Sequence, residues 1–305
     1  MKDHWMTQGD KKGRTVLHHA AIYGYMNVVS FLVKELIESF EEEALQKECL
    51  NVPDYKGRTP LFHAAVEKRA SIVQFLIERG ANMESITNEK HIEQGSTVLM
   101  ACAEINSKEC FEILMKSGAD LLATREDGAD ATYIAARYGH INIIQQIVES
   151  RNVSSIINRP TFRSRTPLLT AAFHGHLQVC KLLFKNGAEV NYEDENKFTA
   201  LIYAANQGYF DIVKWLVENG ANVHVKDNFG ETALMCAEQK QGVQENKEYT
   251  EIIRYLRRFT KEEEEDKNED KGRGKGKRRG KLSLPAVSMS AKLLSNPNNT
   301  KRMSR

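Results

Sequence analysis

The sequence has no long apolar run and few cysteines. Its apolar stretches are short and broken by polar residues, well below the roughly 18 to 20 residues of a membrane helix, so we expect no membrane span. The amino terminus has no apolar segment behind its charges, which argues against a secretory signal. The five cysteines form no CxxC pair, and their odd number favours a reducing compartment over a disulfide framework.

Signatures of common enzymes are also absent, because the chain has neither GxSxG nor HExxH nor a kinase motif. His18 and His19 are adjacent and would point in different directions on a helix. Cys102 and Cys236 lie in alanine-rich segments, which is typical of small core residues. Residues 272–276 alternate glycine with basic residues, but no strand precedes them. We therefore expect no enzyme, no cofactor and no metal site.

Charge is distributed unevenly along the 305 residues, although the formal net charge is only +2. Residues 261–305 hold 13 basic and 7 acidic side chains, a net charge of +6. Residues 1–260 hold the other 30 basic and 34 acidic side chains, a net charge of −4. The sequence therefore predicts a mildly acidic body and a basic tail.

Seven segments resemble one another, each with a short polar residue before an alanine-rich stretch. Their polar anchor residues are Thr15, Thr59, Thr97, Asp130, Thr166, Thr199 and Thr232. The anchors are 44, 38, 33, 36, 33 and 33 residues apart, so the base period is 33 with insertions of 11, 5 and 3 residues. A fixed period of this length indicates stacked structural repeats.

Each period predicts two helices. The anchor can cap the free amides that open the first helix, and Pro60 and Pro167 would occupy its first position, where a missing N–H costs nothing. Alanine pairs in this helix allow a neighbouring helix to approach closely. The second helix ends at a glycine placed to adopt a left-handed conformation, as at Gly187 and Gly220.

The segments Thr166-Pro167-Leu168, Gly175-His176 and Gly187-Ala188-Glu189-Val190-Asn191 resemble the ankyrin repeat, and the resemblance covers about five sixths of the chain. It implies an all-α ankyrin-repeat solenoid of about seven repeats, each a helix-turn-helix with a β-hairpin finger. We expect an extension over residues 1–9, repeats over 10–260 and a disordered tail over 261–305. The repeats would start near residues 10, 54, 92, 125, 161, 194 and 227, the last one acting as a cap.

Three insertions interrupt the period, near residues 39–50, 87–94 and 151–158. The first would lengthen a second helix or add a short one, and the second would lengthen a finger. Insertions in repeat arrays map to loops and sometimes to binding sites, so a binding role and mere tolerance both stay open here.

Ankyrin repeats generally bind other proteins through the fingers and the exposed side of the first helix, and the resemblance places this surface by position. The thirteen residues that we assign to it are called the finger strip: Arg14, Tyr23, Tyr55, Arg58, Arg137, Tyr138, Phe162, Arg163, Arg165, Phe173, His174, Phe198 and Phe229. Aromatic residues and arginine dominate the energetics of protein interfaces. The alternative is that several of the aromatic residues pack on neighbouring fingers and serve stability.

The tail has an acidic run over residues 262–266 and a basic run over 271–281, which holds seven positive and no negative charges. Such a composition does not form a core, so we expect disorder. The basic run suits a nuclear-import signal formed by Lys275, Lys277, Arg278, Arg279 and Lys281. Salt-sensitive binding to nucleic acid or anionic lipid, and a plain solvated tail, are the alternatives.

Two modification sites are also predicted. Asn191 resembles the asparagine that is commonly hydroxylated in ankyrin repeats. The alternative is that it stabilises a turn, a role that does not exclude hydroxylation. Ser304 follows Lys301 and Arg302, as in sites of kinases that prefer basic residues.

Taken together, the sequence predicts a non-enzymatic, monomeric protein-binding module that acts inside the cell as an adaptor, scaffold or inhibitor. It would reside in the cytoplasm or also in the nucleus. The alternative is a nuclear regulator whose basic tail contacts chromatin or RNA while the repeats bind a protein. Nucleic acid would then be bound through the tail only.

Overall fold

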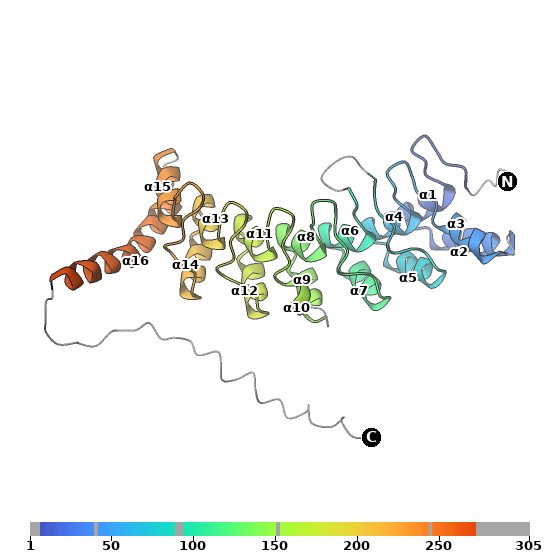
Figure 1. The fold of residues 1–305 in the computed structure, drawn as a ribbon. Helices are drawn as coiled ribbons and strands as arrows, with labels where there is room; N and C mark the ends of the chain where they lie inside the picture. Colours follow the sequence, from blue (N-terminus) through green and yellow to red (C-terminus); the bar gives the residue numbers. More distant parts are fainter. Residues whose placement is uncertain (1–6, 40–41, 89–93, 151–152, 244–245, 273–305) are drawn as a thin grey trace, which may run out of the picture. The chain divides into compact units, whose positions relative to one another are not determined.

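The computed structural model describes residues 7–39, 42–88, 94–150, 153–243 and 246–272, with side chains as far as residue 259. Within these residues the regular elements are helices, and they pair as the repeats predict (Figure 1). The first helices are α1 (Val16–Tyr23), α4 (Pro60–Val66), α6 (Val98–Glu104), α8 (Ala131–Arg137), α11 (Pro167–Phe173), α13 (Ala200–Gln207) and α15 (Ala233–Val243). The second helices are α2 (Met26–Ser39), α5 (Ala70–Glu78), α7 (Lys108–Lys116), α9 (Ile141–Val148), α12 (Leu177–Lys185), α14 (Phe210–Glu218) and α16 (Lys247–Gly272).

The anchors begin the first helices as predicted. Thr59, Asp130 and Thr199 each accept, through the side chain, the N–H of the residue three positions later. Asp130 is buried, and burial raises its pKa to about 6 even though the N–H of Tyr133 donates to it. The same cap recurs at Thr97, Thr166 and Thr232.

Alanine pairs hold neighbouring repeats together. Both alanines of each pair in α1, α4, α8, α11 and α13 are at most 4% exposed. Each first helix contacts the first helix of the next repeat along the whole series from α1 to α15. Because these faces have no bulk beyond a methyl group, a larger side chain there would overpack the contact, at a cost of about 1–3 kcal/mol.

The fingers differ from the predicted β-hairpins, because no strand is assigned in the described part of the chain. In the second finger the N–H of Asp54 donates to the carbonyl of Arg58, and the N–H of Gly57 donates to the carbonyl of Asp54. The N–H of Tyr55 then donates to the carbonyl of Lys12 in the preceding finger, at 3.0 Å. The fingers are therefore tight turns that are linked to one another by isolated backbone hydrogen bonds.

The first and third insertions form short helices. The first insertion both lengthens α2 and adds α3 (Glu43–Leu50). The third forms α10 (Val153–Ile156), which buries Ile156 completely. Most of the second insertion lies outside the described residues, but Thr87 at its start is buried, and its N–H donates to the carbonyl of Ser96.

The last helix is longer than expected. The sequence predicts that the repeats end near residue 260, whereas α16 continues to Gly272 and crosses the boundary at residue 261 between the two units of the chain. Residues 261–272, which were expected to belong to the disordered tail, are therefore helical, and the residues beyond 272 lie outside the described part. Among the described helices, none has the length together with the apolarity that a bilayer crossing requires.

His18 connects the first two repeats and must be neutral to do so. Its Nδ1 accepts the N–H of Thr15 at 3.0 Å, while its Nε2 lies 3.0 Å from the carbonyl oxygen of Arg58. An imidazole that accepts at Nδ1 carries its proton on Nε2, which can then donate to that carbonyl. Burial, together with nearby His63, lowers the pKa of His18 from 6.5 to about 4.

This geometry predicts a pH-dependent stability for which His18 is responsible. The unfolded chain binds the proton near pH 6.5, whereas the folded chain binds it only near pH 4, so the stabilisation is complete above pH 6.5 and is lost as the pH falls to 4. Urea unfolding of the wild type, compared with His18→Gln, should show an extra slope of up to about 1.4 kcal/mol per pH unit in this window. Glutamine also suits this position of a capping box, and parallel profiles for the two chains would contradict the assignment.

Candidate functional site

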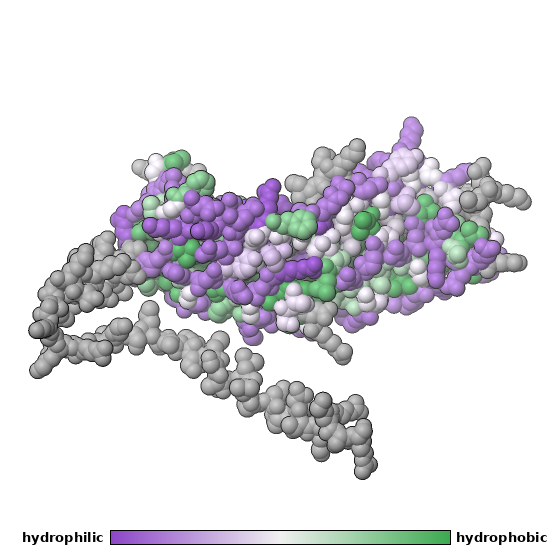
Figure 2. Space-filling model, viewed as in Figure 1, coloured by the Kyte–Doolittle hydropathy of each residue, from purple (hydrophilic) through white to green (hydrophobic). Residues whose placement is uncertain are grey.

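The finger strip divides into two groups in the structure. Its most exposed aromatic residues are Phe229 (80%), Phe162 (76%), Tyr55 (73%), Tyr23 (61%) and Tyr138 (41%). Arg163 is also exposed, whereas the other members are half-buried: Arg14, Arg58, Arg137, Arg165, Phe173, His174 and Phe198. In the view of Figure 2 the visible face of the repeats is mostly hydrophilic, and its apolar residues are scattered.

Six members of the finger strip line one cavity of about 500 Å³ between the fourth and sixth repeats. Its charged lining consists of three arginines and Asp127, and its aromatic lining includes two tyrosines, Tyr133 and Tyr203, that the sequence analysis missed. The six members are Arg137, Phe162, Arg163, Arg165, Phe173 and His174. The remaining strip residues lie outside this cavity.

The three arginines of the cavity have few partners in the described residues. Arg163 makes no ion pair there, and Arg137 only lies over the ring of Tyr138, with its Cζ atom 5.6 Å from the ring centroid. Arg165 lies 3.8 Å from Asp194, and its Nε is buried without a hydrogen-bond partner. Asp194 is already engaged, because it accepts from the hydroxyl of Tyr203. The cavity therefore keeps an excess of positive charge.

The pKa of His174 is consistent with this excess of positive charge. Burial, followed by the nearby Arg137 and Arg165 among other groups, lowers the pKa of His174 from its ordinary value. The imidazole is therefore neutral at pH 7, and an anion in the cavity would favour its charged form.

Tyr203 organises the floor of the cavity from α13. The ring of Phe173 meets it edge-on, with centroids 5.3 Å apart, and the ring of Phe198 stacks on it at 5.0 Å. The hydroxyl of Tyr203 donates to Asp194, and burial, together with this carboxylate, keeps its pKa well above the ordinary value. Phe173 and Phe198 therefore pack on a neighbouring side chain, as the alternative interpretation of the strip expects.

Phe162 stands at the rim and depends on a close approach of two fingers. Its N–H donates to the carbonyl of Asp127 in the preceding finger, at 3.1 Å. Gly128 beside it has a φ of +81°, and a Cβ atom there would lie 2.8 Å from the backbone nitrogen of Phe162. Glycine is thus required for the contact that presents Phe162 to solvent.

In the first two repeats the strip arginines are held by aspartates of their own fingers. Arg14 contacts Asp10, and Arg58 contacts Asp54, each at 3.1 Å. Burial alone would raise the pKa of Asp54, but hydrogen bonds from His63 and from the backbone of Arg58 outweigh it and keep the pKa below its ordinary value. These two arginines therefore stabilise the fingers as well as facing the strip.

Tyr138 also has a structural partner. Its hydroxyl donates to Glu104 of the preceding repeat at 3.1 Å, and the other carboxylate oxygen of Glu104 pairs with buried Arg125 at 2.6 Å. The sequence offers little signal for this contact, because Glu104 and Tyr138 are 34 residues apart.

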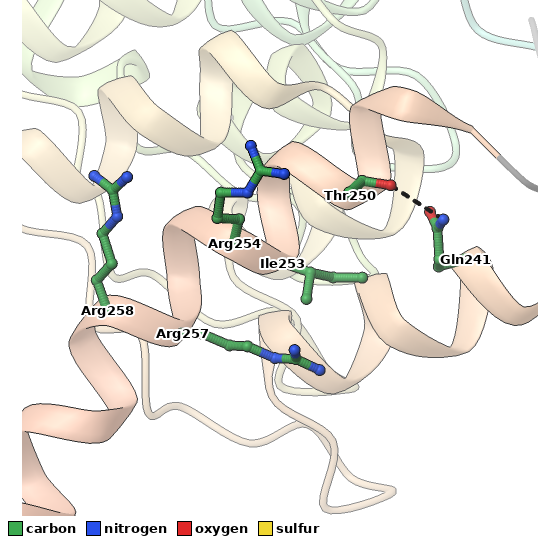
Figure 3. Close-up of a pocket in the computed structure, with 6 residues that line it drawn as sticks. All are labelled: Gln241, Thr250, Ile253, Arg254, Arg257 and Arg258. Atoms are coloured by element: carbon green, nitrogen blue, oxygen red, sulfur yellow. Dashed lines mark hydrogen bonds between the residues drawn. The ribbon is translucent and has the colours of Figure 1, made fainter.

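A second cavity, of about 540 Å³, lies between α15 and α16 (Figure 3). Three arginines of the last repeat, Arg254, Arg257 and Arg258, are exposed and line it. Arg257 pairs with Glu238 of α15 at 2.7 Å. This arrangement is typical of a solvated end cap.

Asn191 joins its own turn to the next one through two hydrogen bonds of its side-chain amide. Its Nδ2 donates to the carbonyl of Gly220 at 3.0 Å, and its Oδ1 accepts the N–H of Asn222 at 2.8 Å. Asn158 does the same one repeat earlier, with Gly187 and Glu189. The predicted import signal over residues 275–281 and Ser304 lie outside the described residues.

Comparison with known proteins identifies the class to which this architecture belongs. The family model of ankyrin repeats in three copies matches residues 2–87, 83–157, 151–227 and 168–271, so the chain belongs to the ankyrin-repeat family. The solved ankyrin-repeat domain of Bcl-3, described as a unique member of the IkappaB protein family, is similar with a TM-score of 0.64 and 26% identity. The match covers 80% of this chain and 99% of that one.

Curated relatives match only over part of their length. Inversin of Canis lupus familiaris is 30% identical over 118 residues, which cover 38% of this chain and 11% of inversin. Alpha-latrotoxin-Lh1a of Latrodectus hasselti is 41% identical over 66 residues, 22% of this chain and 5% of the toxin. A transient receptor potential cation channel, subfamily A member 1, of Drosophila melanogaster is 25% identical over 190 residues, 62% of this chain and 15% of the channel. The likeness to these relatives therefore concerns a small part of each of them.

The two groups of the finger strip should respond differently to truncation. Phe162→Ala should change the free energy of unfolding by less than about 0.5 kcal/mol, because the ring is mostly exposed. Phe173→Ala should lower it by about 1–3 kcal/mol, because its ring packs on Tyr203 and His174. Urea unfolding followed by circular dichroism measures both values. Equal losses for the two variants would show that Phe162 is packed rather than presented.

Proposed function

We propose that this chain binds one or more proteins non-covalently through the finger strip and acts inside the cell as an adaptor, scaffold or inhibitor. The observation that carries the proposal is the cavity between the fourth and sixth repeats, where Arg137, Arg163 and Phe162 lie together. Arginine and exposed aromatic side chains are the residue types that contribute most to protein binding.

Charge selects the kind of partner. The cavity presents three guanidinium groups against one lining carboxylate, Asp127, so a partner segment with an acidic side chain is favoured. The exposed ring of Phe162 offers an apolar contact beside it. Complementary charge would contribute orientation and association rate more than raw affinity.

The ankyrin-repeat family supports the same function, because its fold is an interaction fold that is not itself catalytic. The residue types of the finger strip also favour binding, because they offer cationic and aromatic contacts rather than a nucleophile with a base. We expect the chain to act as a monomer, with the strip open to its partner.

The test is a triple variant, Arg137→Ala/Phe162→Ala/Arg163→Ala, in a quantitative pull-down from cells that express the full chain. Partner capture should fall at least tenfold, because the cavity loses two guanidinium groups and its rim aromatic residue. The melting temperature should stay within about 2–4 °C of the wild type, because Phe162 and Arg163 are exposed and Arg137 is only half-buried.

The matched control is Lys181→Ala/Lys214→Ala, which removes two exposed positive charges from α12 and α14. It should capture the same proteins as the wild type. If the control loses capture as strongly as the triple variant, net charge rather than the finger strip explains the binding.

A second candidate function is a nuclear regulator whose tail contacts chromatin or RNA. It is favoured by the basic run over residues 271–281, with seven positive charges and no negative one. Phosphate backbones attract such a run by counterion release, which is lost with increasing salt. The nuclear location belongs to this candidate, and the cytoplasmic location belongs to the first.

Removal of residues 273–305, which leaves α16 complete, separates the two candidates. Under the second candidate, nuclear accumulation of a fluorescent fusion and retention on nucleic acid at physiological salt should both fall at least fivefold. If both are unchanged, the second candidate is wrong, whereas binding through the finger strip should survive the deletion.

A further inference from the structure

An aspartate at the base of several fingers follows one pattern. Asp10, Asp54 and Asp194 each accept two backbone N–H groups of their own finger through Oδ1. The other oxygen, Oδ2, accepts from a side chain nine residues later in the first helix. These donors are His19, His63 and Tyr203.

The seventh finger keeps half of this pattern. Asp227 Oδ1 accepts the N–H groups of Phe229 and Glu231, at 2.8 and 2.9 Å. Asp227 is 5% exposed, and its Oδ2 is buried without a hydrogen-bond partner. A buried carboxylate oxygen without a partner is costly, so this group calls for a cation or a donor.

The basic residues that surround the aspartate in the first two fingers are replaced by acidic groups in the seventh finger. Cys236 stands nine residues after Asp227. Its thiol lies 3.8 Å from a carboxylate oxygen of Glu231 and does not donate to Asp227. Four residues after Asp227 stands Glu231, at the position where the first two fingers have Arg14 and Arg58. A guanidinium and an imidazole are thus replaced by a carboxylate and a thiol.

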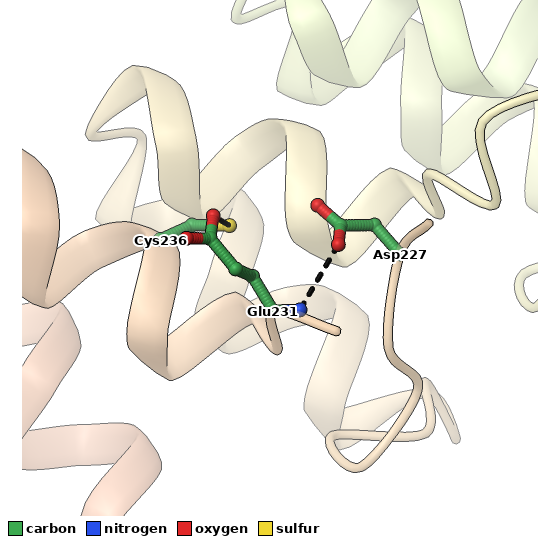
Figure 4. A group of neighbouring side chains, drawn as sticks. All are labelled: Asp227, Glu231 and Cys236. Carbon is green, nitrogen blue, oxygen red and sulfur yellow. Dashed lines mark hydrogen bonds between the residues drawn. The ribbon is translucent and has the colours of Figure 1, made fainter. Parts of the chain in front are cut away.

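Figure 4 shows these side chains at the start of the seventh repeat, with the carboxylate of Glu231 beside the sulfur of Cys236. One ligand atom of each of Asp227, Glu231 and Cys236 lies within 4.8 Å of the other two. Ligands of a tetrahedral zinc ion are about 2.0–2.3 Å from the metal, so the three side chains would rotate toward one another to bind one ion.

We propose that Asp227, Glu231 and Cys236 form a binding site for a divalent zinc ion, with water as the fourth ligand. The ion would supply the positive charge that an arginine supplies in the first two fingers, and it would satisfy Oδ2 of Asp227. Sulfur favours zinc over magnesium and calcium, which prefer oxygen ligands only. Glu231 is half-exposed, which leaves a path for the ion and for water.

The site has three protein ligands from one finger and one helix, so binding would hold the seventh finger against α15. Phe229 lies between Asp227 and Glu231 in that finger and belongs to the finger strip. The bound ion would therefore fix the end of the strip. This inference stands independently of the proposed function, because it rests on the finger base and not on the cavity of the fourth to sixth repeats.

The experiment uses the full chain with reduced cysteines and zinc alone as the probe. Competition with a chromophoric chelator should show one saturable site per chain, and zinc should raise the melting temperature by mass action. Cys236→Ala should weaken binding at least tenfold, because it removes the one sulfur ligand. The matched control is Cys110→Ala, because Cys110 lies beside Cys102 in the third repeat and is not part of the proposed site.

A second variant guards against simple loss of folding. Glu231→Arg rebuilds the arrangement of the first two fingers, so the zinc-free variant should melt at or above the wild-type temperature and should not respond to zinc. The proposal is overturned if the wild type shows no saturable zinc binding. It is also overturned if binding persists in Cys236→Ala and Glu231→Arg, or if it follows Cys110 instead.

Discussion

The close approach of neighbouring first helices is the constraint on which the rest of this structure depends. Alanine pairs such as Ala135–Ala136 and Ala204–Ala205 are fully buried, and no repeat covers them by itself. Each repeat is therefore stable only between its neighbours, as in other solenoids. The same contact sets the spacing of the fingers, because every finger leads directly into a first helix. A change in this packing would displace the whole finger strip.

The finger-base aspartates are the second level of organisation. Asp10, Asp54 and Asp194 each close the turn of their own finger through Oδ1 and accept from the first helix through Oδ2, which connects finger and helix. The residue nine positions after the aspartate varies from histidine to tyrosine to cysteine, and Cys236 does not donate to Asp227. The repeats thus share a backbone and differ in chemistry: the tyrosine builds the floor of an aromatic cavity, and the cysteine faces a second carboxylate.

The strip shows how packing and recognition share the same residues. Phe173 and Phe198 lie in register with the exposed strip residues, yet both pack on Tyr203. Phe162 and Arg163, on the finger beside them, point to solvent. Sequence position alone assigns both groups to one surface, because it counts residues from the anchor and does not know which neighbouring side chain is large enough to cover them.

The sequence by itself determined the helix order, the caps, the buried alanine pairs and the family, because these depend on local periodicity and on residues a few positions apart. It did not determine which strip residues have partners in neighbouring repeats. Arg165 lies beside Asp194, 29 residues later, and Tyr138 donates to Glu104, 34 residues earlier. It also could not reveal the reversed charge at Asp227, since an oxygen without a partner is a property of three-dimensional packing. The tertiary structure decided these features because they depend on distances between side chains of stacked repeats.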